Sequence, residues 1–210
     1  RLEGLYRKGL DNAGAEIFDC RAELVDRNTV RLVGLDRTVT AATILIATGG
    51  QPNPHAALPG HELCISSNEA FHLDTLPRSI AIAGGGYIAV EFANIFHGLG
   101  VDTTLVYRGK EILGRFDMDL RRMLHETMEK KGIRILCHTI FDRIQRRSDG
   151  RLDAHLLDNG HLVVDTVMLA LGRTPNTEGL GLEAAGVAVG PRGEIPVDQF
   201  SRTNVDNIYA

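Results

Sequence analysis

From residue 79 onward, short apolar runs alternate with longer stretches in which apolar residues recur every three or four positions. The first pattern is typical of buried strands, and the second is typical of helices that bury one face. The elements predicted in this region are a strand over 80–83, a helix over 87–99, a strand over 103–107, a helix over 118–131 and a strand over 133–137. Asp117 and Gly132 are of the types expected at the start and the stop of the second helix. Because strands and helices alternate, the order predicts a parallel sheet.

The same region contains one antiparallel excursion. Asp158-Asn159-Gly160 separates two runs in which apolar and polar residues alternate, a pattern typical of a β-hairpin with a tight turn. The apolar run 167–171 then completes the series. We therefore predict an α/β fold with a parallel sheet plus an antiparallel β-excursion.

The first fifty residues show a different pattern. Leu2, Leu5, Tyr6 and Leu10 recur at helical spacing, and Gly14 is a typical stop signal. Strand-like runs follow over 15–18, 30–33, 39–41 and 43–48. The last run is apolar throughout, which predicts a strand buried on both faces. The stretch 51–77 is rich in proline, and we expect loops there with one short helix.

Two distant segments of the chain correspond to each other. Residues 44–53 align without a gap with residues 167–176, and each segment follows a short run of predicted β-structure. One interpretation is two similar buried strands. The other is two copies of one nucleotide-binding architecture. Only the second copy has a Gly-rich turn, at Gly84, so on this interpretation the first copy's turn lies before the first residue. The chain would then be a fragment.

Composition narrows the possible partners. The chain of 210 residues is 43% hydrophobic and 24% charged, with a net charge of −4, which is typical of a globular protein. Positive and negative residues are interspersed, so neither a nucleic-acid nor a membrane partner is expected. No apolar run reaches the length of about 18 residues that a spanning helix needs. Three scattered cysteines predict no disulfide framework and favour a reducing, cytoplasmic location.

The strongest motif is Gly84-Gly85-Gly86-Tyr87-Ile88-Ala89, which matches the pattern Gly-x-Gly-x-x-Gly/Ala between a predicted strand and a predicted helix. In such a motif the first glycine permits a tight turn, and the second lets a pyrophosphate approach the backbone. The third small residue permits close packing of helix on strand. Because the free N–H groups of the helix N-terminus attract phosphates, we predict a Rossmann-like dinucleotide-binding domain.

The residue type at the end of the second strand indicates which dinucleotide is bound. An NAD site has an acid there that binds the ribose 2′-hydroxyl. Here Tyr107 is followed by Arg108, and the first acid is Glu111. A guanidinium binds a 2′-phosphate in a bidentate manner, so Arg108 favours NADP(H).

No metal site is expected, because the eight histidines form no His-x-x-x-His pair. His125-Glu126 is read as part of a solvated helix face. The sequence alone supports no Ser/His/Asp arrangement either.

Three segments carry a family resemblance, namely Leu76 to Asp117, Ala47-Thr48-Gly49-Gly50 and Gly172-Arg173-Thr174-Pro175-Asn176. With them, the chain resembles the flavin-dependent pyridine nucleotide–disulfide oxidoreductases, and within these the central part of the glutathione reductases. The resemblance implies that residues 1–50 are the end of an FAD-binding domain and 51–172 an NADPH-binding domain. Residues 173–210 would then return to the FAD-binding domain, so that incomplete parts of it flank the Rossmann-like domain.

The resemblance also implies roles for individual residues. Tyr87 matches the tyrosine that covers the nicotinamide pocket, and Glu91 matches the glutamate that pairs with a lysine beside the flavin; both are candidate catalytic residues. Arg108 matches one of two arginines on the 2′-phosphate. The second aligns with Gly114, although Arg115 follows directly. The remaining cofactor-binding candidates are Gly84, Gly86, Ile88, Ala89, Gly172 and Arg173 for NADP(H), and Thr48 and Gly49 for FAD.

The resemblance further implies a homodimeric enzyme that passes hydride from NADPH through FAD to a cysteine pair, which reduces glutathione disulfide. The cysteine pair, the flavin glycine motif and the family's His/Glu acid–base pair do not occur in these residues, so this polypeptide alone is expected to be inactive. Three alternatives remain: a mercuric or lipoamide type of disulfide reductase, a stand-alone NADPH-binding module, and a purely structural domain. The acid typical of lipoamide enzymes does not occur near Tyr107.

Overall fold

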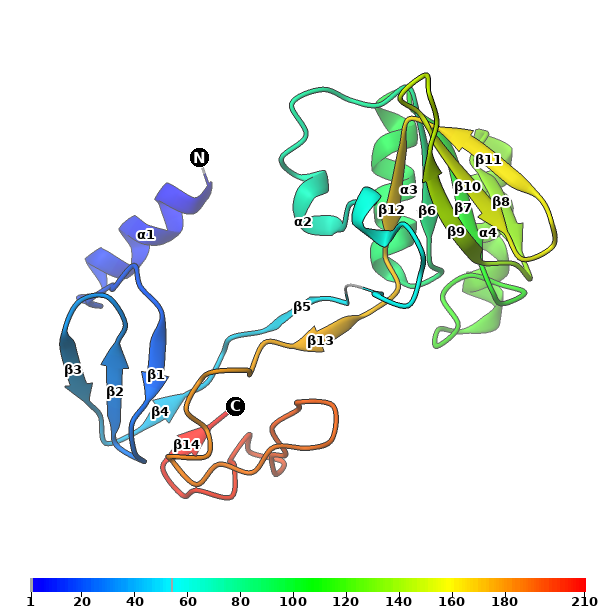
Figure 1. The fold of residues 1–210 in the computed structure, drawn as a ribbon. Helices are drawn as coiled ribbons and strands as arrows, with labels where there is room; N and C mark the ends of the chain where they lie inside the picture. The colour runs from blue at the N-terminus through cyan, green and yellow to red at the C-terminus, as the bar shows by residue number, and fades with distance from the viewer. Residues whose placement is uncertain (1, 54) are drawn as a thin grey trace. The chain divides into compact units, whose positions relative to one another are not determined.

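The computed structural model describes residues 2–53 and 55–210. The chain divides into two compact units. Unit 1 comprises Arg1–Gly50 and Pro175–Ala210, and unit 2 comprises Gln51–Thr174. The chain therefore leaves unit 1, forms unit 2 as one continuous segment, and returns to unit 1 (Figure 1).

Unit 2 is built around a four-stranded parallel sheet in the order β12-β6-β7-β8. Its strands are β6 (Ser79–Ala83), β7 (Asp102–Tyr107), β8 (Arg134–Cys137) and β12 (Thr166–Leu169). The helices α3 (Tyr87–Gly98) and α4 (Met118–Lys131) connect β6 to β7 and β7 to β8. An antiparallel sheet of β9 (Phe141–Arg146), β10 (Leu152–Leu156) and β11 (His161–Val164) then leads to β12. The predicted fold class is confirmed.

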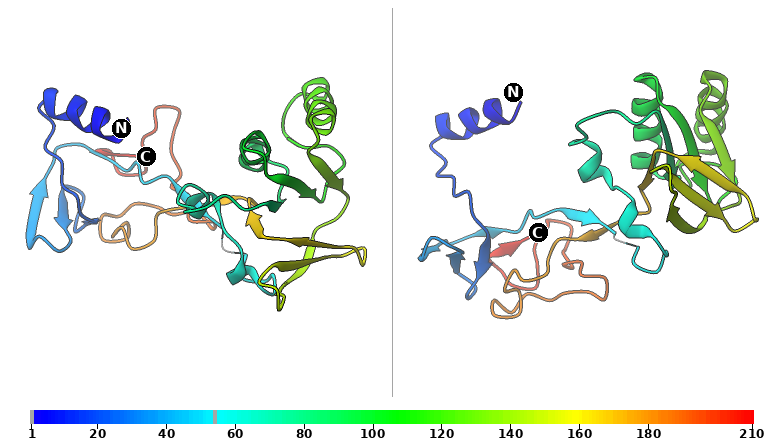
Figure 2. Two further views of the ribbon diagram at one scale, coloured as in Figure 1. Left: turned by 90° about the horizontal axis from the view of Figure 1, so that it is seen from above. Right: turned by 45° about the horizontal axis from the view of Figure 1, so that its top comes forward.

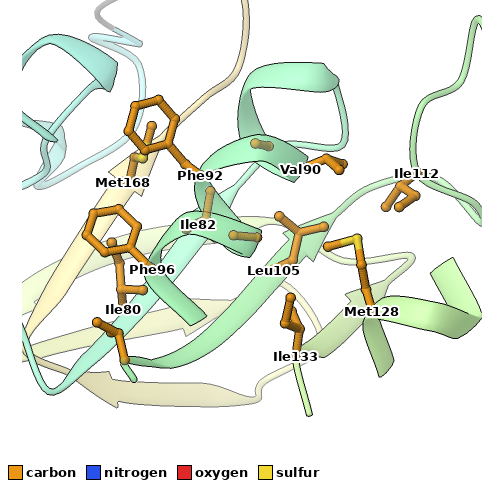
Figure 3. Packing of buried hydrophobic residues seen from close by; sticks show 13 residues of the cluster. Ile80, Ile82, Val90, Phe92, Phe96, Leu105, Ile112, Met128, Ile133 and Met168 are labelled. Carbon is orange, nitrogen blue, oxygen red and sulfur yellow. The ribbon is translucent and has the colours of Figure 1, made fainter. Parts of the chain in front are cut away.

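Alternate residues along the parallel strands contribute to two separate buried clusters. Ile80 and Ile82 of β6 pack with Leu105 of β7 against α3 and α4, as Figure 3 shows for this cluster. Ala81 and Ala83 of the same strand point to the other side, where they pack against β9–β11. Because successive side chains of a strand face opposite ways, one apolar run supplies both clusters. The result is three layers, with helices, parallel sheet and antiparallel sheet in that order (Figure 2).

The ends of α4 follow the sequence signals. The Asp117 side chain accepts hydrogen bonds from the backbone N–H groups of Asp119 (3.0 Å) and Leu120 (3.4 Å). Gly132 has φ of +105°, the left-handed conformation that glycine adopts without strain. The hairpin turn at 158–160 is also confirmed, since Asn159 has φ of +64° between β10 and β11.

Unit 1 begins with α1 (Leu2–Asn12), none of whose residues is buried. An antiparallel sheet follows, formed by β1 (Ala22–Leu24), β2 (Thr29–Leu32) and β3 (Arg37–Thr40). The strand β4 (Ile44–Leu45) pairs in parallel with β14 (Ile208–Tyr209) near the end of the chain. A small core packs β1 and β14 against the segment 182–187, and it consists of Leu24, Leu182, Ala185, Val187 and Ile208.

The internal correspondence extends to the structure. An antiparallel three-stranded sheet precedes β4 as another precedes β12, and each strand is followed by a positive-φ glycine, Gly49 (+65°) or Gly172 (+115°). The next strands, β5 (Gly50–Pro52) and β13 (Arg173–Pro175), occupy equivalent alignment positions and pair with each other. Their flanking bonds are equivalent too: Asn53 N–H donates to Gly172 O (3.1 Å), and Asn176 N–H donates to Gly49 O (2.9 Å).

The sequence predictions differ from the structure at several places, and the strand β1 was among the elements not predicted. Residues 15–18 form no strand, because none of the described strands lies beside them to pair with their backbone. The predicted strand 43–48 is reduced to Ile44–Leu45, and Leu45 is 67% exposed rather than buried, since β4 pairs with β14 alone among the described strands. The strand β9 was missed, because it buries only Phe141 and Ile144, three positions apart, and therefore lacks the alternation of a strand.

The segment 51–77 contains, besides the end of β5, a 3₁₀ turn at His61–Leu63 and the short helix α2 (Ser67–Ala70). The Ser66 hydroxyl accepts from Asn68 N–H (3.1 Å), while the Ser66 N–H donates to the Glu69 carboxylate (2.7 Å), so α2 begins with a capping box. The expectation of loops with one short helix is thus confirmed.

Candidate functional site

A cavity of about 850 Å³ lies in unit 2 where the parallel strands end. Its lining comes from the residues at the ends of β6, β7, β10 and β12, from the segment that leads into β9, and from residues 55–58. In open α/β sheets, ligands bind at the carboxyl ends of the strands, so this is the expected place for a binding site. A second hollow, of about 590 Å³, lies beside the β2–β3 hairpin of unit 1 and contains none of the predicted site residues.

The Gly-rich turn forms one wall of this cavity, and its three glycines have different surroundings. Gly84 has φ of +135°, and a Cβ there would run into the carbonyl of Ala170. A Cβ at Gly85 would meet the ring of Tyr107. A Cβ at Gly86 would meet no protein atom within 4 Å, so the backbone at Gly86 borders open space. The turn therefore packs tightly on the protein at Gly84 and Gly85 and leaves space beside the cavity at Gly86.

The helix α3 begins at this turn, with Gly86 as its N-cap. Gly86 offers no side-chain cap, and the Val90 N–H donates to the Gly86 carbonyl (3.1 Å) as the helical bonding begins. The N–H groups of Tyr87, Ile88 and Ala89 precede this bond, where a helix leaves its donors available to an anion. Ala89 is fully buried, and its small side chain permits close packing of α3 on β6.

Tyr87 and Glu91 lie one turn apart on α3 and are both exposed. Tyr87 is 57% exposed and lines the cavity, whereas Glu91 does not line it. The helical spacing places both side chains on one face of α3.

Two guanidinium groups border the cavity near the end of β7. Arg108 and Arg115 are exposed and line it, whereas Gly114 does not. Within the described residues, neither arginine has a hydrogen bond or an ion pair. Leu113 has φ of +55°, and its N–H donates to the Gly85 carbonyl (2.6 Å), which fixes this loop against the Gly-rich turn. The structure therefore brings Arg115, one position after the aligned Gly114, to the cavity.

Gly172 and Arg173 line the same cavity after β12. Thr48 and Gly49 belong to unit 1 and are not part of this cavity. All the residues predicted to bind NADP(H) thus line one cavity, except Ala89, which is buried where α3 packs on β6.

The sequence did not predict several of the residues that line the cavity. His55 lines the cavity, and its buried Nε2 has no hydrogen-bond partner among the described residues. The half-buried ring of Tyr107 lies between Gly85 and Gly109 and supports the turn. Ile140 and Leu157 add exposed apolar surface, 41% and 60% exposed. These residues come from loops or strand ends that are distant in sequence.

The three cysteines form no disulfide with one another. All three are free thiols, and Cys20 lies in unit 1 while Cys64 and Cys137 lie in unit 2. Burial, with a smaller effect from Glu62, raises the pKa of Cys64 to about 12, so its reactive thiolate is scarce at neutral pH. Burial and the nearby charges of Glu111 and Glu129 also raise the pKa of Cys137. Among residues 2–53 and 55–210, no His, Cys, Asp and Glu side chains cluster in a way that could hold a metal ion.

The model of the pyridine nucleotide-disulphide oxidoreductase family matches residues 1–210. The chain belongs to this family. A family member from Burkholderia cepacia, a glutathione reductase, is 44% identical over 211 residues, which cover 100% of this chain and 46% of that protein. The glutathione reductase of Nostoc sp. is also 44% identical, with 100% and 48% covered. The trypanothione reductase of Leishmania donovani is 43% identical over 82% of this chain and 35% of its own.

Solved structures of flavoprotein disulfide reductases agree with the fold. The HOCl-induced flavoprotein disulfide reductase RclA from Escherichia coli superposes with a TM-score of 0.88 at 29% identity. The match covers 99% of this chain and 48% of that protein. The chain therefore spans about half the length of the two glutathione reductases and of RclA. In the described part of the chain, no helix has both the length and the apolar composition that crossing a bilayer requires.

Proposed function

We propose that this chain is the NADPH-binding portion of an FAD-dependent glutathione-disulfide reductase. The observation that carries the proposal is the cavity of unit 2. It combines a Gly-rich turn at a helix N-terminus with two guanidinium groups, Arg108 and Arg115, that have no partner among the described residues. These groups suit a dinucleotide that carries an additional phosphate.

The cavity fits NADPH along its length. The open space at Gly86 would accept the pyrophosphate, which the N–H groups at the start of α3, including those of Ile88 and Ala89, would bind. Gly84 and Gly85 have no such space, since they pack against Ala170 and Tyr107. Arg108 and Arg115 would bind the 2′-phosphate, and Gly172 with Arg173 would border the cofactor from the opposite strand.

Tyr87 and Glu91 are proposed for the nicotinamide end. The exposed Tyr87 side chain would cover the nicotinamide pocket and move aside when NADPH enters, because little protein holds it in place. Glu91, on the same helix face, would pair with a lysine beside the flavin. In the full-length protein, we expect Tyr87→Gly to change the hydride-transfer step more than 2′-phosphate binding.

Unit 1 is proposed as part of the FAD-binding domain. It repeats the arrangement of an antiparallel sheet, a parallel-paired strand and a positive-φ glycine that borders the cavity in unit 2. Thr48 and Gly49 would lie near the FAD adenosine. When bound, FAD supplies the acceptor for the hydride of NADPH and passes two electrons to a disulfide.

The whole enzyme is proposed to be a cytoplasmic homodimer with glutathione disulfide as substrate, because two of the relatives described above are glutathione reductases. Trypanothione disulfide is the second candidate, since a relative of 43% identity is a trypanothione reductase. Both disulfides should be tested with the full-length protein.

The experiment that tests cofactor choice measures NADPH and NADH binding to the 210-residue protein by titration calorimetry. NADPH should bind more tightly than NADH. Loss of a charged hydrogen bond costs about 1.5–3 kcal/mol, so Arg108→Ala should weaken NADPH binding roughly ten- to hundredfold. NADH binding should remain nearly unchanged. Equal weakening for both cofactors would indicate a folding defect, and tighter NADH binding by the wild type would contradict the proposal.

A further inference from the structure

The loop between β7 and α4, residues 108–117, carries Arg108 and Arg115, two of the arginines that line the cavity, and one acid, Glu111, ahead of the helix cap at Asp117. An acid beside the proposed 2′-phosphate site would weaken NADPH binding, because a carboxylate repels a 2′-phosphate and suits a ribose 2′-hydroxyl instead. Arg108 precedes Glu111 by three positions, and Arg115 follows it by four. The direction in which Glu111 points therefore bears on cofactor choice.

The structure turns Glu111 away from the cavity. Arg108 and Arg115 line the cavity, and Glu111 does not. Its carboxylate instead meets the side chain of His125 on α4, with 2.7 Å between Oε2 and Nδ1. Both side chains are largely buried, 18% exposed for Glu111 and 14% for His125. Because a carboxylate only accepts hydrogen bonds, His125 Nδ1 carries the hydrogen and donates it.

A second residue of α4 holds the backbone of the same loop. The Arg121 guanidinium donates to the carbonyl of Ile112 from Nε (2.8 Å) and to the carbonyl of Glu111 from Nη2 (2.8 Å). With the Leu113 N–H bonded to Gly85 O, the loop is tied to α4 on one side and to the Gly-rich turn on the other. The Glu111 backbone is thus fixed, and its side chain has a defined direction toward α4.

We propose that the Glu111–His125 pair determines cofactor specificity by holding the Glu111 carboxylate away from the 2′-phosphate site. His125 is a positioning residue, since it does not line the cavity and acts through Glu111. This inference rests on the proposed function, because it concerns how the same cavity distinguishes NADPH from NADH.

The test compares the dissociation constants of NADPH and NADH for the wild type and four variants of the 210-residue protein. His125→Ala releases the carboxylate, whereas His125→Asn keeps a donor near the position of Nδ1. The double variant His125→Ala/Glu111→Ala removes the released charge. Lys130→Ala is the matched control, because Lys130 forms an exposed ion pair with Glu126 on the same helix (3.6 Å).

We expect His125→Ala to weaken NADPH binding by roughly three- to tenfold, the effect of one additional charge a few ångströms from a phosphate. NADH binding should be unchanged or slightly tighter. His125→Asn and Lys130→Ala should keep the wild-type ratio, and the double variant should recover most of it. The effect of His125→Ala should also shrink as salt is added, which a purely structural defect would not do.

Several results would overturn the inference. An unchanged ratio in His125→Ala would do so, as would equal weakening of both cofactors or a double variant no better than His125→Ala. Thermal unfolding without ligand identifies variants that fail to fold, and His125→Asn then provides the comparison. A wild type without preference for NADPH would overturn the proposed function and this inference together. Loss of the inference alone leaves the wild-type preference intact.

Discussion

At Gly84 the backbone has φ of +135°, and the space where a side chain would begin is occupied by the Ala170 carbonyl. At Gly86 the backbone is extended, with φ of −82° and ψ of 176°, and faces open space. The two glycines of this turn therefore have different roles: Gly84 meets a steric requirement of the fold, whereas the proposed role of Gly86 is to leave space for the ligand.

Gly84→Ala should destabilise unit 2, because alanine is strained at this φ and its Cβ would overlap the backbone of Ala170. A residue forced into such a conformation costs about 1–3 kcal/mol. Urea unfolding followed by circular dichroism measures the loss. A variant as stable as the wild type would show that the turn relaxes without cost.

Gly86→Ala is the control for Gly84→Ala, because it adds the same methyl group two positions along the same turn. Since a Cβ at residue 86 would meet no protein atom, the free energy of unfolding should stay within about 0.5 kcal/mol of the wild type. NADPH binding should weaken roughly tenfold or more, because the methyl group takes space needed by the pyrophosphate. Calorimetric titration checks this, and undiminished binding would mean that the pyrophosphate lies elsewhere.

At the scale of elements, α4 matters because it supports the loop that carries Arg108 and Arg115. Its first turn is capped by Asp117, and its last turn ends at Gly132. The helix contributes Met128 to the core, and it contributes Arg121 and His125 to the loop. A change at its N-terminus therefore affects stability and the geometry of the cavity together.

Asp117→Ala should lower the free energy of unfolding of unit 2 by about 1 kcal/mol, the usual cost of removing an N-cap side chain. Asp117→Asn should keep most of the stability, because its side-chain oxygen still accepts from Asp119 and Leu120. Urea unfolding of the two variants side by side distinguishes capping from loss of charge. If both variants lose equally, the carboxylate charge rather than the cap is responsible.

At the scale of the molecule, the two compact units differ in how much they bury. Unit 2 has large apolar clusters on both sides of its parallel sheet, whereas the described core of unit 1 is small and leaves α1 without a buried residue. Apolar burial is the main favourable term in folding, so unit 2 should be the more stable.

We therefore expect two unfolding transitions in a calorimetric scan, with unit 1 unfolding first. NADPH should shift only the transition of unit 2, because the cavity lies within that unit. At a ligand concentration of about a hundred times Kd, the stabilisation should be about 2.7 kcal/mol. A single transition that NADPH shifts as a whole would show that the two units unfold cooperatively.

The sequence by itself determined the features that depend on neighbouring residues. The alternation of helices and strands, the Gly-rich turn, the cap at Asp117 and the hairpin at Asn159 all follow from local periodicity and local backbone preference. The sequence also predicted the place of Arg108, because the residue after the second strand of a dinucleotide-binding motif lies at a defined position relative to the Gly-rich turn.

Only the tertiary structure decided which side chains meet across the fold. Arg115 rather than Gly114 reaches the cavity because Leu113 takes a positive φ and bonds to the Gly-rich turn. His125, read from sequence as a solvated residue, is largely buried against Glu111, fourteen positions away. Such contacts depend on how a helix packs beside a loop, and no pattern within either segment encodes that packing.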